Sequence, residues 1–286
     1  MSRRPVPPLR LVASALAVGA LLTTAACSDG GGGSTTAADT AAEQARAAEE
    51  DVAKQPPTNS RIASPSASPS TLTESGAKAA LLTEADLEGD WNQVADAEKW
   101  RETLLVGEVD VSDFLTAKTE AAECQRLLDR LYSQDLLGKP SGASALTGFE
   151  QGGSRLLEQV AAYDRAALDD ALKWMDSLPV DCDRFTATGE TGEKRTVQVT
   201  EASVPDLGDA REGLHVTVRG PAAGNPATLT LDIAAVRVGS SALTVTGGGL
   251  DGGELSYVEQ GARQGTERLK TVLAGGTPSP QPTNLD

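Results

Sequence analysis

Apolar residues recur with two different periods in residues 77–275. A period near 3.6, which places apolar side chains on one face of a helix, extends over 119–137, 165–177 and 256–273. Alternation with a period of two, or a short apolar run between turn residues, predicts strands. The predicted strands are 143–150, 156–163, 185–187, 195–204, 214–219, 227–238 and 242–246, and a further apolar run at 104–106 is ambiguous. Consecutive strands with helices grouped apart predict an α+β domain, an antiparallel β-sheet of about five to seven strands backed by helices.

Turn residues set the ends of several of these elements. Gly138 ends the first helix, and Pro179 stops the second because proline removes a helical hydrogen bond. Gly152–Ser154 and Gly239–Ser241 each lie between two predicted strands and indicate hairpins.

A different pattern stands at the N-terminus. The apolar run of residues 11–22 follows three arginines and is too short to cross a membrane, which takes about 20 apolar residues. It is typical of a secretory signal peptide. Cys27 follows two alanines and resembles the lipobox of bacterial lipoproteins, with Thr24 where leucine is usual. We therefore expect residues 1–26 to be removed and Cys27 to carry fatty acyl chains such as palmitate, on the extracytoplasmic side of the cell membrane. The alternative is a secreted protein with a spare cysteine.

Composition divides the rest of the chain. Residues 27–76 are rich in Gly, Ala, Ser and Pro, which cannot bury a core, so this segment is expected to be a disordered, lipid-anchored linker. As a coil it spans on the order of 40 Å. The domain is expected over 77–275, followed by a disordered tail at 276–286. Whether sugars modify the linker is left open.

Charge and cysteines narrow the function classes. Losing residues 1–26 removes three arginines and no acids, so the formal charge goes from -16 to -19. Such a surface repels nucleic acid, which excludes a nucleic-acid partner. After Cys27 only Cys124 and Cys182 remain, and an even pair in an exported protein predicts a disulfide. Two free buried thiols are the alternative.

Residues that could suggest catalysis or cofactor binding lack the neighbouring sequence features that such sites require. The glycines at 247, 249 and 252 have the spacing of a dinucleotide fingerprint, but no βαβ unit surrounds them, so we expect a flexible glycine loop. His215 is the sole histidine, and no G-x-S-x-G elbow accompanies it. The acidic pair at 169–170 lies on the polar face of a helix and lacks calcium-loop spacing. We therefore expect no catalytic residue, no metal and no cofactor, and the protein is predicted not to be an enzyme.

Four residues remain as candidates for ligand contact. Arg155 and Arg237 are strand arginines in an acidic protein and are candidates for an anionic ligand, with a surface ion pair as the default. Tyr163 is a candidate for lining a cleft, with core packing as the more common role. His215 alternates with Leu214 and Val216, so it faces the opposite side of its strand.

Several segments together resemble a known family. They are Leu81–Leu87, where Thr83 and Asp86 match a capping box, Ala122–Cys124, Trp174 with Asp181–Phe185, and Val236–Gly239 with Leu243–Val245. They resemble the extracellular sensor domain of PknH-type membrane kinases, a domain that lipoproteins of high-GC Gram-positive bacteria also carry. The resemblance covers most of residues 77–275 and implies an antiparallel sheet with packed helices and a cleft for an unidentified ligand. It implies two disulfides in many members, whereas this chain can form one, and no kinase half is present.

The expected function is that of a lipid-anchored extracytoplasmic sensor or ligand-binding lipoprotein without catalysis. Its expected partners are the membrane, through the anchor at Cys27, and an unknown small molecule, lipid or envelope protein. One alternative is a carrier that shields a lipid or lipoglycan in an apolar cavity, which requires several hundred Å³. The other is a cell-wall hydrolase, which would have to use a carboxylate or His215.

Overall fold

The structure is a computed structural model that describes residues 71–98, 112–222, 225–250 and 255–279. The predicted signal peptide, Cys27, the linker up to residue 70, the ambiguous run at 104–106 and most of the predicted tail lie outside these residues. The predictions made for them stay predictions.

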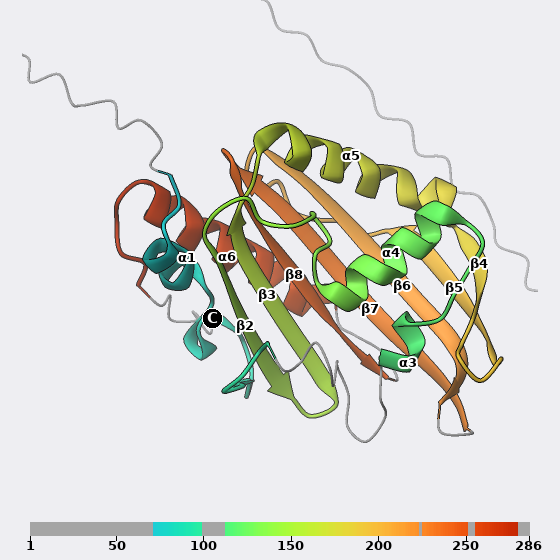
Figure 1. Cartoon of the computed structure of the whole chain (residues 1–286). Helices are drawn as coiled ribbons and strands as arrows, with labels where there is room; N and C mark the ends of the chain where they lie inside the picture. The colour runs from blue at the N-terminus through green and yellow to red at the C-terminus, as the bar shows by residue number, and fades with distance from the viewer. Residues whose placement is uncertain (1–70, 99–111, 223–224, 251–254, 280–286) are drawn as a thin grey trace, which may run out of the picture. The chain divides into compact units, whose positions relative to one another are not determined.

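The domain is built on one antiparallel sheet of eight strands in the order β1-β2-β3-β8-β7-β6-β5-β4 (Figure 1). The strands are β1 Asn92–Gln93, β2 Ser144–Gln151, β3 Ser154–Ala162, β4 Arg184–Thr188, β5 Lys194–Glu201, β6 Ala210–Ala222, β7 Asn225–Val238 and β8 Ser241–Leu250. This confirms the α+β class and the antiparallel sheet. The strand beyond the expected five to seven is β1, because two polar residues carry no apolar period to detect.

Helices cover both faces of this sheet (Figure 1). They are α1 Glu74–Ala80, the 3-10 turn η1 Glu84–Asp86, α3 Ser112–Leu115, α4 Ala122–Ser133, α5 Arg165–Asp181 and α6 Leu255–Leu273. Figure 1 shows α3, α4 and α5 on one face, whereas α6, with α1 beside it, packs on β3, β7 and β8 from the other. Side chains of a strand alternate between the faces, so each face has its own apolar core.

Both predicted helix bounds on the first face need correction. The helix expected over 119–137 is shorter: it begins at Ala122 and ends at Ser133, where Gln134 takes the left-handed conformation with φ 57°. A left-handed residue ends a helix because it turns the backbone away from the helical path. The helix expected to stop before Pro179 continues to Asp181. Its last turn is held by a bond from the Cys182 N–H to the Leu178 carbonyl at 2.8 Å.

A disulfide joins these two helices. Cys124, in the first turn of α4, is bonded to Cys182, the residue that follows α5, across a separation of 58 positions. Both residues are almost fully buried. The predicted disulfide is confirmed, and it fixes one end of α4 against the end of α5.

The glycine-rich segment is strand and not the expected loop. Gly247 and Gly249 both lie within β8, and Gly252 is outside the described residues. A Cβ on Gly247 would stand 2.6 Å from the Cγ2 of Val258 in α6. Glycine at this position therefore lets α6 approach the sheet closely, and the described part of the motif is a strand and not the loop that a dinucleotide fingerprint requires.

Candidate ligand-binding pocket

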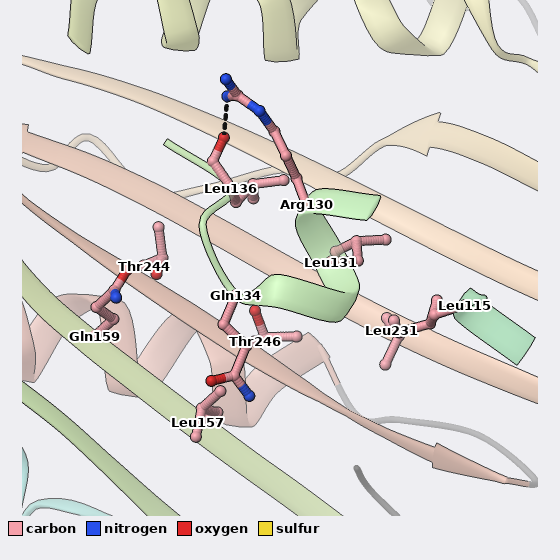
Figure 2. Close-up of a pocket in the computed structure, with 10 residues that line it drawn as sticks. All are labelled: Leu115, Arg130, Leu131, Gln134, Leu136, Leu157, Gln159, Leu231, Thr244 and Thr246. Carbon is pink, nitrogen blue, oxygen red and sulfur yellow. Dashed lines mark hydrogen bonds between the residues drawn. The ribbon is translucent and has the colours of Figure 1, made fainter. Parts of the chain in front are cut away.

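A pocket lies between the C-terminal half of α4 and the central strands β3, β7 and β8 (Figure 2). It offers about 30 Å³ of room to water-sized molecules, roughly enough for two waters. Its lining is Leu115, Arg130, Leu131, Gln134, Leu136, Leu157, Gln159, Leu231, Thr244 and Thr246.

Strand pairing brings the polar part of this lining together. Leu157 lies opposite Thr246, and Gln159 lies opposite Thr244, in the β3–β8 ladder. Residues opposite each other in an antiparallel pair point to the same face, so both pairs face α4. Figure 2 shows Gln159 and Thr244 at one end of the pocket and the apolar Leu231 toward the other. The pocket is therefore amphipathic.

Gln159 receives support from a second buried group. The hydroxyl of Tyr163 donates to the Oε1 of Gln159 at 3.5 Å, and both side chains are buried. Burial raises the pKa of Tyr163 well above its usual value, so the phenol keeps its proton and remains a donor. Tyr163 thus acts behind the pocket wall, through Gln159, and does not line the pocket itself.

The charge of Arg130 is directed away from the pocket. Its Nη1 donates to the Leu136 carbonyl at 2.8 Å, and its guanidinium carbon stands 4.8 Å from the ring centre of Trp174. Figure 2 shows the guanidinium turned toward α5. Burial lowers the pKa of Arg130 from its ordinary value. The groups that face the pocket interior are therefore neutral amides, hydroxyls and leucines.

Trp174 of α5 holds α4 in place over the pocket. Its indole Nε1 donates to the Oε2 of Glu123 at 2.8 Å, and the guanidinium of Arg126 stacks 4.4 Å from its ring centre. Together with Arg130, two cations of α4 contact one aromatic ring, an arrangement that is attractive through the ring quadrupole. With the disulfide, this contact sets the height of α4 above the sheet.

The other sequence candidates lie apart from this pocket and from one another. Arg155 pairs with Glu150 at 3.4 Å. Arg237 is buried, and its guanidinium contacts Asp169 on α5 at 3.3 Å. His215 lies on the opposite face of the sheet from Leu214, and its Nδ1 is 2.6 Å from the Oδ1 of buried Asp232. The structure brings none of these three side chains together, and their role in ligand contact stays a prediction.

The polar pocket residues escaped the sequence analysis. Gln134, Gln159 and Thr246 belong to no motif, and Thr244 lies in the segment Leu243–Val245 of the family resemblance without being a candidate for ligand contact. Only Gln159 could have been noticed from the sequence, because it is a polar residue inside the apolar predicted strand 156–163. Thr244 and Thr246, which lie on the neighbouring strand β8, do not stand out in the sequence in this way.

A second hollow lies where β5 ends and β6 begins. It is open to solvent, measures about 430 Å³, and is lined partly by Glu201 and Glu212. Burial, with the negative charges of Asp176 and Glu201, raises the pKa of Glu212 to about 7. In the described part of the chain, no group of three His, Cys, Asp or Glu side chains is placed to hold a metal ion.

Comparison with known proteins finds a similar solved structure and no matching family. No family model matches the chain, and no curated protein matches it. Among solved structures, it is similar to the extracellular domain of PknH from Mycobacterium tuberculosis, with 11% identity, 72% of this chain and 98% of that chain covered, and a TM-score of 0.37. A match at this level carries no argument about function, so membership of the PknH-type sensor family stays a prediction. None of the described helices is long and apolar enough to cross a membrane.

Proposed function

We propose that the protein is a lipid-anchored, extracytoplasmic sensor or ligand-binding lipoprotein without catalysis, and that the pocket under α4 is its recognition site. The amphipathic lining of that pocket is the observation that carries the proposal. A small apolar group would contact the leucines, while Gln159, Thr244 and Thr246 would accept or donate hydrogen bonds at its polar end.

The size of the pocket sets the class of ligand. Drug-sized ligands occupy roughly 300–1,000 Å³, far more than the room available here. A ligand would therefore insert one small end group between α4 and the sheet. The pocket under α4 has no room for an acyl chain, so this site favours the sensor over the lipid-carrier alternative.

The anchor is supported by the lipobox resemblance at Cys27 alone. The Cys27→Ala variant is expected in the culture medium and wild type in the membrane fraction. Retention of the variant in the membrane would contradict the anchor and leave the pocket proposal standing.

The pocket is tested by native mass spectrometry of the Cys27→Ala protein secreted by its own host. We expect a co-purifying small mass that is lost in Cys27→Ala/Thr246→Leu, since the longer side chain fills the pocket. Ser256→Leu, at an exposed position of α6, is the matched control and should keep the mass. A bare polypeptide in both proteins, or a mass that Thr246→Leu retains, would overturn the pocket as the site. A mass of lipid size would favour the carrier.

A further inference from the structure

Among the described residues, strands β4, β5 and β6 have helices on one face only. In Figure 1, α4 and α5 lie on the near face of the sheet, while α6 lies behind β3, β7 and β8. Apart from Gly213, the strand residues that point away from α5 on β4, β5 and β6 are exposed or half-buried. We name this surface the threonine face, and it comprises Arg184, Thr186, Lys194, Thr196, Gln198, Thr200, His215, Thr217 and Arg219.

The register arranges these residues in rows across the strands. One row runs Thr186, Thr196, Arg219, and the next runs Arg184, Gln198, Thr217. Neighbours within a row are about 4.8 Å apart, which is close to the length of one pyranose unit, and successive rows are about 6.8 Å apart. The surface therefore presents regularly spaced hydroxyl and amide groups and no large apolar side chain.

The charge on this face has the opposite sign to that of the whole protein. The chain carries a formal charge of -16, yet the face presents Arg184, Lys194 and Arg219. On the neighbouring strand β7, Asp232 lies opposite His215 on the same face; its carboxylate is buried and pairs with His215. No described acidic side chain pairs with Lys194 or Arg219. At physiological salt, charges are screened beyond about 8 Å, so a partner on this surface meets the local cations and not the net charge.

We infer that the threonine face binds an extended acidic polysaccharide. The cations select an anion, and the hydroxyls and amide match the hydrogen-bonding groups of sugars. A second copy of the chain is disfavoured because it would oppose like charges. Single-stranded nucleic acid is disfavoured because the face has no aromatic ring on which a base could stack. This inference does not rest on the proposed function, since the pocket lies on the other face of the sheet.

Binding to polygalacturonate, with neutral dextran as the control polymer, tests this inference in the full-length Cys27→Ala protein. We expect binding to polygalacturonate at low salt, no binding to dextran, and loss of binding at about 0.5 M NaCl, where screening is nearly complete. The double variant Lys194→Glu/Arg219→Glu should bind on the order of tenfold more weakly, because each reversal replaces an attraction by a repulsion.

The matched control is Lys173→Glu/Arg263→Glu, which changes the net charge by the same amount at exposed positions of α5 and α6. It should bind as wild type does. Equal weakening in both double variants, or no binding by wild type, would overturn the inference. Thr186→Val/Thr196→Val should bind severalfold more weakly with all charges in place, and unchanged binding would contradict the role of the hydroxyls. Charge-dependent binding to vesicles of equal parts phosphatidylcholine and phosphatidylglycerol, without binding to polygalacturonate, would replace the polysaccharide by a membrane.

Discussion

Glu158 is a buried carboxyl whose replacement should change how stability depends on pH. It points from β3 toward α6, its Oε2 accepts the Leu82 N–H at 2.7 Å, and its Oε1 has no described hydrogen-bond partner. A Cβ on Gly265 of α6 would stand 2.3 Å from that Oε1. The charged groups nearby are Arg268 on α6 and Asp86 on η1, which pair with each other at 3.2 Å.

Burial raises the pKa of Glu158 from 4.5 to about 8, and the negative charge of Asp86 adds to the effect, while the Leu82 N–H and Arg268 oppose it. A raised pKa in the folded state means that folding favours the protonated carboxyl. Its contribution to stability is therefore present below pH 4.5 and is lost as the pH rises toward about 8. The difference of about 3.5 pKa units corresponds to about 5 kcal/mol over the whole range, of which about 4 kcal/mol falls between pH 5 and pH 9.

The test is Glu158→Gln, which keeps the shape and removes the titration. We expect the variant to gain about 4 kcal/mol relative to wild type on going from pH 5 to pH 9, measured as the free energy of unfolding in urea. Glu212, whose pKa is also raised, remains in both proteins and cancels from the comparison. Glu190→Gln removes the same charge from an exposed turn and corrects for net charge. If the difference between variant and wild type is the same at both pH values, the carboxylate is not destabilised by burial and the reasoning is wrong.

Three further changes test the packing of the helices. Replacing both Cys124 and Cys182 by alanine should lower the free energy of unfolding by about 4 kcal/mol, as the chain-entropy model gives for a loop of 58 residues, and an unchanged urea midpoint would contradict it. Trp174→Phe removes an indole hydrogen bond and weakens the stacking on two arginines, so unfolding in urea should become easier by about 1–2 kcal/mol; no loss would mean that this contact does not hold α4. Gly265→Ala places a Cβ against the carboxyl of Glu158 and should cost about 1–3 kcal/mol by thermal unfolding, whereas a more stable variant would show that α6 moves away freely.

Local patterns predicted most of the elements because each pattern lies within one segment. The hairpin at Gly239–Ser241 is formed by β7 and β8, with Val238 opposite Ser241 and Gly239 at φ 66°. Thr83 and Asp86 form the expected capping contact, in which the Thr83 N–H donates to the Oδ2 of Asp86 at 2.7 Å. Helix ends were less predictable, since the ends of α4 and α5 depend on what the last turn contacts.

The sequence by itself determined the α+β class, the order of elements, the disulfide and the direction in which His215 points, because periodicity and residue counts are properties of the chain alone. Only the tertiary structure decided that β3 pairs with β8, and hence that Gln159 meets Thr244 beneath α4. The same long-range pairing placed Glu158 under α6 and, among the described residues, left one face of β4–β6 without a helix. These features escape sequence analysis because strand register joins residues about 85 positions apart, and no local period encodes which strands become neighbours.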